Sequence, residues 1–147
     1  MVNVLLVEDD EVEIMSVRRA FRLMRIEHNL VVARDGVEAL QVLRGESGAS
    51  KLARPYVILL DVNMPRMNGR EFLREVRLDP EHGEADVIVL TTSTADADRR
   101  AACDARVAGY VVKSTLGEDF SAFAGAIAGF LHLLVPGAEA NVSMRPE

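Results

Sequence analysis

The chain has 147 residues, 49% hydrophobic and 27% charged, which are the proportions of an ordinary globular protein with one domain. Its net charge of −6 argues against nucleic-acid binding, because such binding depends mostly on basic side chains that neutralise phosphates. The single cysteine excludes an internal disulfide bond, and neither a signal peptide nor a membrane-spanning stretch is evident, so we expect a cytoplasmic protein.

Five short apolar or β-branched runs predict strands along the chain. They are Val2–Val7, Leu30–Ala33, Tyr56–Leu60, Val87–Leu90 and Gly109–Val112. The first, third and fourth runs are almost wholly apolar, which is typical of strands that helices cover on both faces.

Between these runs, apolar residues recur every three or four positions, which is the helical period. The first and third helices show the clearest apolar stripes, formed by Ile14, Val17, Phe21 and Met24 and by Phe72, Leu73 and Val76. Strict alternation of strands and helices predicts an α/β fold, a doubly wound five-stranded parallel sheet with five helices. Two segments lie outside this pattern, the long connection Gly45–Arg54 and the polar tail after Pro136.

Polar residues follow the strands at the edge where ligands of open α/β sheets bind. In chain order they are Glu8, Asp9 and Asp10, then Asp61, then Thr91, Thr92 and Ser93, and finally Lys113. Carboxylates gathered at one edge repel one another, and a divalent cation with oxygen ligands offsets that repulsion. Mg²⁺ fits best, because it typically takes one or two carboxylates, several waters and a phosphoryl oxygen.

A bound cation and Lys113 would let a phosphoryl group approach Asp61, whose carboxylate could then act as a nucleophile and form an acyl phosphate. Each residue alone has a simpler explanation. Asp10 is expected mainly to cap the first helix, Thr91 can cap the fourth, and Lys113 can be a solvated charge. The interpretation rests on their joint placement at successive strand ends.

At these positions the chain resembles the receiver domains of bacterial response regulators, from Val2 to about Leu134. The matching residues are the acidic cluster, Asp61 with Met64, Pro65 and Gly69 behind it, Thr91, and the run from Tyr110 to Lys113. The resemblance implies a flavodoxin-like strand order, 2-1-3-4-5, with a receiver domain at residues 1–135 and a tail at 136–147.

The resemblance also implies a role for each matching residue. The Mg²⁺ ligands would be Glu8, Asp9, Asp61 and the backbone carbonyl of Asn63. Asp61 would accept the phosphoryl group from a sensor histidine kinase, and Thr91 and Lys113 would contact its oxygens. Tyr110 would turn inward as Thr91 moves, and the surface of the fourth helix, fifth strand and fifth helix would transmit the signal. The protein would thus be a signalling switch and not a classical enzyme.

One departure narrows the resemblance, because most receivers have a proline after the lysine and this chain has Ser114. Ser114, the long connection after the second helix and the run Leu90–Ser93 are similar to the stand-alone response regulators of bacterial phytochromes. A bacteriophytochrome is therefore a candidate for the kinase. No output domain is expected after Pro136, so the output would be a protein contact, a phosphoryl relay or removal of phosphate from the kinase.

The predicted fifth helix has an outward face without charge. Its residues are Ser121, Ala122, Gly125, Ala126, Ala128, Gly129, His132 and Leu133. An uncharged face of this size is typical of a contact surface, and we expect a homodimer through it. Two alternatives stay open: the tail folds back over this face, or a kinase or target binds there.

Three other function classes agree less well with the sequence. A flavodoxin-like cofactor binder needs a loop after the first strand that cradles phosphate, but here that loop is Glu8–Glu11, which would repel one. A phosphatase of the haloacid dehalogenase type generally has a second acid two residues after the nucleophile, where this chain has Asn63. A degenerate receiver that only binds partners would not need the full set of site residues.

Overall fold

The computed structural model describes residues 2–24, 27–46, 48, 51–61, 69–91 and 107–112, with four further single positions at 125, 128, 129 and 132. Within them, five parallel strands form one sheet. They are β1 (Val2–Val7), β2 (His28–Ala33), β3 (Tyr56–Asp61), β4 (Val87–Thr91) and β5 (Gly109–Val112). Their order across the sheet is β2-β1-β3-β4-β5, so the predicted parallel sheet and its strand order are confirmed.

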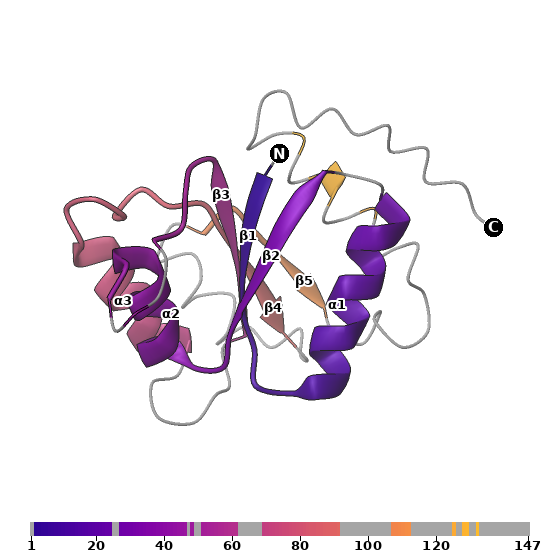
Figure 1. Cartoon of the computed structure of the whole chain (residues 1–147), viewed down its shortest axis with the longest axis horizontal. Helices are drawn as coiled ribbons and strands as arrows, with labels where there is room; N and C mark the ends of the chain where they lie inside the picture. The colour runs from indigo at the N-terminus through magenta and orange to yellow at the C-terminus, as the bar shows by residue number, and fades with distance from the viewer. Residues whose placement is uncertain are drawn as a thin grey trace.

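Helices cover both faces of this sheet. In the described part of the chain they are α1 (Glu11–Met24), α2 (Gly36–Arg44) and α3 (Gly69–Leu78). Figure 1 shows α1 on one side of the sheet and α2 with α3 on the other, which is the doubly wound arrangement. The predicted fourth and fifth helices lie outside the described residues, apart from the four single positions. No helix in the described part is both long and apolar enough to cross a membrane.

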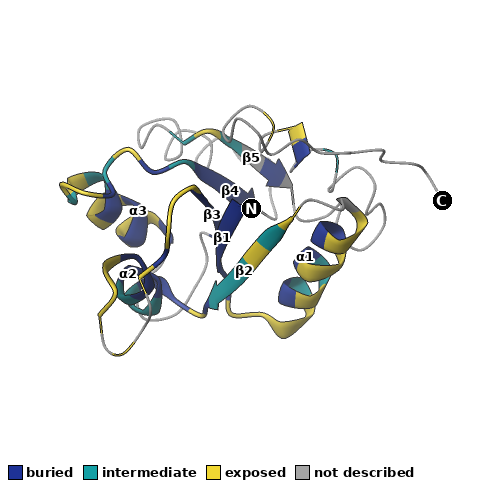
Figure 2. Cartoon of the chain, turned by 45° about the horizontal axis from the view of Figure 1, so that its top comes forward, coloured by how far each residue is buried: buried dark blue, intermediate teal, exposed yellow. Residues whose placement is uncertain are grey.

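The core lies between the sheet and the inner faces of the helices. Every residue of β1 and β3 is buried, because helices cover both faces of these central strands. On α1, Ile14, Val17 and Phe21 are buried while Arg18 and Arg22 are exposed, as the sequence predicts. Figure 2 shows the same division on α1, with its buried side turned to the sheet. Burying a side chain such as that of Phe21 contributes about 1.5–3 kcal/mol.

The strand β2 begins two residues earlier than predicted, at His28. Its first two residues are polar and so give no apolar signal, but they pair with β1 in the register Val2↔His28 and Asn3↔Asn29. The Asn29 side-chain amide also donates to Oδ1 of Asn3 at 3.2 Å. Pairing with a neighbouring strand therefore extends β2 beyond its apolar run.

The uncharged face predicted for the fifth helix is described at four positions. Gly129 and His132 are exposed as expected, and Gly125 is intermediate. Ala128 is only 4% exposed, so its placement on the outward face is wrong. Alanine is small and apolar and is among the residues most often fully buried, so its lack of charge does not by itself indicate an outward face.

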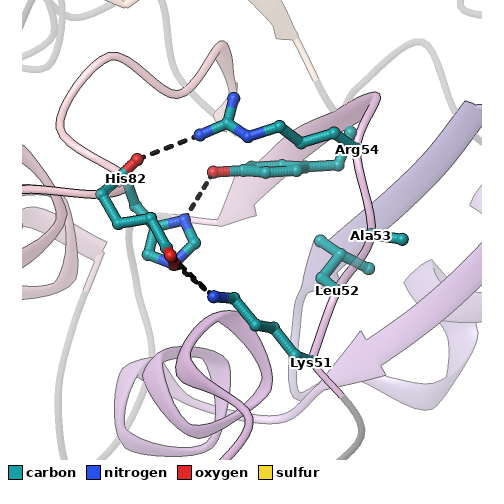
Figure 3. Close-up of a pocket in the computed structure, with 7 residues that line it drawn as sticks. Lys51, Leu52, Ala53, Arg54 and His82 are labelled. Atoms are coloured by element: carbon teal, nitrogen blue, oxygen red, sulfur yellow. Dashed lines mark hydrogen bonds and ion pairs between the residues drawn. The ribbon is translucent and has the colours of Figure 1, made fainter.

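The long connection between α2 and β3 contacts the loop after α3 at the amino-terminal edge of the sheet. Gly45 ends α2 with φ of 68°, and a side chain there would come within 2.9 Å of Lys51 Cβ. Figure 3 shows Lys51, Arg54 and His82 converging on one pocket. Lys51 forms an ion pair with Glu81 at 2.6 Å, and the Arg54 guanidinium donates to the Glu81 carbonyl at 3.0 Å. The connection is thereby bound to the loop that follows α3.

Candidate metal centre

Three carboxylates meet at the carboxyl edge of the sheet, at the ends of two neighbouring strands. Glu8 directly follows β1, and Asp61 is the last residue of β3. Because Val7 pairs with Leu60, these two residues are next to each other in the register. Glu8, Asp9 and Asp61 each contribute one oxygen, and the three oxygens lie within 4.8 Å of one another.

Two of these carboxylates are removed from water. Glu8 is fully buried and Asp61 is 4% exposed, whereas Asp9 is exposed. A like-charged pair about 4 Å apart costs about 1 kcal/mol in water and about 4 kcal/mol at an effective dielectric constant near 20. A cation bound between the three carboxylates would lower this repulsion.

The sheet holds the backbones of both buried acids. The Glu8 amide donates to the Ala33 carbonyl at 2.9 Å and so continues the pairing of β1 with β2. Asp61 pairs with Leu90 of β4 in the register of the sheet. Asp9 instead lies in the turn to α1, where the Asp10 side chain caps the helix by accepting from the Val12 amide at 2.8 Å. The prediction that Asp10 caps this helix is confirmed.

The oxygen set fits a small hard cation. Two ligands at about 2.1 Å from one Mg²⁺ lie at most about 4.2 Å apart, so oxygens within 4.8 Å are already close to that spacing. Carboxylate oxygens without nitrogen or sulfur ligands suit Mg²⁺ or Mn²⁺ better than softer metals.

The remaining predicted site residues are described only in part. Thr91 ends β4 beside Asp61, and its backbone pairs with Val112 in the sheet register. Tyr110 lies in β5, paired with Val89. The side chains of Thr91 and Tyr110, and the whole of Asn63 and Lys113, lie outside the described residues.

One interaction at this edge was not predicted from the sequence. The Arg34 guanidinium forms an ion pair with Oε1 of Glu11, the first residue of α1. Arg34 directly follows β2, just as Glu8 directly follows β1. Arg34 is a charged residue immediately after a predicted strand, which is the same sequence signal that identifies the acids and Lys113.

Comparison with known proteins identifies the family. A model of the response regulator receiver domain matches residues 4–122. The chain belongs to this family. It is 36% identical over 111 residues to response regulator Rcp1 of Synechocystis sp., and the match covers 76% of each chain.

Solved structures of receiver proteins are similar over most of the chain. The Mn²⁺-bound form of Rcp1 superposes with a TM-score of 0.76 at 30% identity, over 94% of this chain and 97% of that one. The phosphorylated cyanobacterial phytochrome response regulator RcpA gives a TM-score of 0.78 at 32% identity, over 95% and 97%. The bacteriophytochrome response regulator RtBRR gives 0.75 at 34% identity, over 87% and 76%. The predicted resemblance to receivers, and to those linked to phytochromes, is confirmed.

Proposed function

We propose that this protein is a phosphorylation switch that accepts a phosphoryl group on Asp61 from a sensor histidine kinase, with Mg²⁺ as cofactor. The observation that supports it most is the meeting of Glu8, Asp9 and Asp61 at one edge of the sheet, with two of the three carboxylates buried. Membership of the receiver family agrees with it. The titles of similar structures name a Mn²⁺-bound form and a phosphorylated form of those proteins.

Asp61 would be the nucleophile of the transfer. A carboxylate oxygen forms a bond to phosphorus while the bond between phosphorus and the imidazole nitrogen of the donor breaks, and that nitrogen keeps the electron pair. Mg²⁺, held by Glu8, Asp9, Asp61 and the Asn63 carbonyl, would neutralise charge on the phosphoryl oxygens.

Three further residues would take part in the response to the phosphoryl group. Lys113, directly after β5, would offset its negative charge, and the hydroxyl of Thr91 would donate to one of its oxygens. Tyr110 would turn inward as Thr91 moves. The signal would then pass to the surface of the fourth helix, β5 and the fifth helix, within a receiver domain at residues 1–135.

The exposed face of α1 is the surface that we propose for kinase docking. It lies next to the metal centre, since α1 begins two residues after Asp9. Val12 is 71% exposed and Met15 is 65% exposed, and with Ser16, Arg19 and Arg22 they line a shallow hollow. An apolar patch with basic residues beside it suits a helix with apolar and acidic side chains. The similarity to phytochrome response regulators makes a bacteriophytochrome the candidate kinase.

We also propose a homodimer through the uncharged face of the fifth helix. The support is the sequence of that helix, together with the exposure of Gly129 and His132; the buried Ala128 is not part of this face. Small residues let two backbones approach closely, and twofold pairing is the commonest association of identical chains.

Labelling by acetyl phosphate tests the phosphoacceptor. Phosphorylation of the unaltered protein should shift the intact mass by one phosphoryl group, and Asp61→Asn should abolish the shift. Asp86→Asn is a matched control, because Asp86 is half-buried elsewhere in the chain and should not affect labelling. Equal labelling of Asp61→Asn and the unaltered protein would refute the assignment of Asp61.

A further inference from the structure

The ion pair between Arg34 and Glu11 connects two segments that meet at the metal centre. Glu11 is the first residue of α1, and Arg34 lies between β2 and α2. The two residues are 23 positions apart in the chain. Both side chains are exposed, so neither packing nor burial explains the pair.

The backbone of Arg34 is fixed on both sides. The preceding residue, Ala33, accepts the Glu8 amide at 2.9 Å at the end of the sheet. The following residue, Asp35, is the N-cap of α2 and accepts the Glu38 amide at 2.8 Å. The backbone segment that carries Arg34 is therefore held at both ends.

Asp9 lies two residues before Glu11, in the turn that leads from β1 into α1. On one side of Asp9, the sheet holds the buried Glu8. On the other side, the turn continues through Asp10 to Glu11, the partner of Arg34. Asp9 itself is exposed, so packing does not fix its carboxylate as it does that of Asp61. A metal ligand binds best when its position is set before the ion arrives.

We propose that Arg34 is a positioning residue for the divalent cation: its ion pair with Glu11 holds the turn that presents Asp9. The inference rests on the proposed function, because it assumes that the cation binds at Glu8, Asp9 and Asp61.

The direction in which metal affinity changes when Arg34 is replaced distinguishes a positioning role from a purely electrostatic one. Arg34 is itself a cation near a cation site, so through-space repulsion alone predicts that its removal strengthens binding of the metal. Positioning predicts the reverse. Since exposed ion pairs contribute modestly, we expect Arg34→Met to weaken binding by about two- to fivefold.

Binding can be measured with Mn²⁺, detected by electron paramagnetic resonance and displaced by Mg²⁺. Arg34→Lys keeps the charge and can still pair with Glu11, so it should restore most of the affinity. Arg18→Met removes an exposed cation from the middle of α1 and should leave the affinity unchanged or slightly raised. Thermal unfolding without metal should show all three variants folded with melting temperatures close to that of the unaltered protein.

A double-mutant cycle with Glu11, the partner of Arg34, tests whether the two residues act through the same ion pair. Glu11→Gln should also weaken binding, and adding Arg34→Met to it should cause no further loss. If Arg34→Met binds Mn²⁺ as tightly as the unaltered protein or more tightly, or if the two losses add, the inference is wrong while the proposed function stands. If the unaltered protein binds no Mn²⁺, the proposed function is wrong and the inference falls with it.

Discussion

The hydroxyl of Tyr56 lies 2.8 Å from Nδ1 of His82, which joins the first residue of β3 to the loop after α3. Both side chains are buried, and the other ring nitrogen of His82 lies 2.9 Å from Oε2 of Glu81. The tyrosine hydroxyl can donate to Nδ1 when the ring carries its proton on Nε2, the nitrogen on the side of the carboxylate. Burial raises the pKa of Tyr56 above its ordinary 10.0, so the hydroxyl remains a donor at neutral pH.

Tyr56→Phe should destabilise the protein by about 1–3 kcal/mol, because it leaves Nδ1 of His82 buried without its partner. Urea unfolding at pH 7 measures this change. In a His82→Leu background, Tyr56→Phe should reduce the free energy of unfolding much less, since the buried nitrogen is then absent. An equal cost in both backgrounds would show that the hydrogen bond is not the cause.

The same tyrosine should contribute to the loss of stability in alkali. A tyrosine with a raised folded-state pKa stays neutral in the folded protein after it has ionised in the unfolded chain. Its stabilising effect is therefore complete below pH 10 and is lost as the pH rises through the folded pKa. The unfolding free energy of the unaltered protein should thus fall more steeply above pH 10 than that of Tyr56→Phe.

Asp79 should make stability depend on pH at the acidic end. Burial, the largest single influence on Asp79, opposes its ionisation. The Glu81 and His82 amides and the Arg44 guanidinium outweigh it, and hold the pKa of Asp79 below its usual 3.8. Their donor–acceptor distances to the carboxylate are 2.8, 3.0 and 3.1 Å. A lowered pKa stabilises the folded state above the unfolded pKa, and the effect is lost as the pH falls through the folded pKa.

Asp79→Asn keeps an acceptor oxygen and removes only the charge, so it should lower the urea midpoint at pH 7. The difference from the unaltered protein should shrink as the pH falls below about 3.9, because the carboxylate is then protonated in the unfolded chain and, at still lower pH, in the folded protein. Glu84→Gln, an exposed acid in the same loop, serves as the control and should leave the midpoint nearly unchanged. A difference that is as large at pH 2.5 as at pH 7 would exclude the charge as its source.

Much of the site could be predicted because it depends on local signals. The apolar runs before Glu8 and Asp61 identify buried strands, and parallel strands bring their carboxyl ends to one edge. The contacts of the long connection could not be predicted in this way. Tyr56 and His82 are 26 residues apart, and neither lies in a periodic pattern that points to the other. The pairing of Arg34 with Glu11 likewise joins residues 23 positions apart, and no local pattern in either segment points to the other.

The metal role of Asp9 is tested by its removal. Without a cation the pocket holds three carboxylates, so phosphorylation by acetyl phosphate should require Mg²⁺ and should stop in excess EDTA. Asp9→Ala should reduce metal affinity and labelling together. Asp10→Asn removes the neighbouring charge but keeps the cap on α1, and it should retain most of both. Full labelling in EDTA would contradict the metal role.

The uncharged face of the fifth helix should mediate pairing of two chains. Glutamate at Ala126 and Leu133 would bury like charges across a twofold contact, so the double variant should sediment as a monomer at micromolar concentration. Labelling of Asp61 should stay intact, because the acceptor lies at the edge of the sheet and not on this helix. Glutamate at Val12 and Met15 places the same charges on another exposed apolar face, and that variant should remain a dimer. The dimer proposal fails if the unaltered protein already sediments as a monomer, both with and without the phosphoryl group. Loss of dimer in both double variants would instead mean that added charge, and not this face, sets the association.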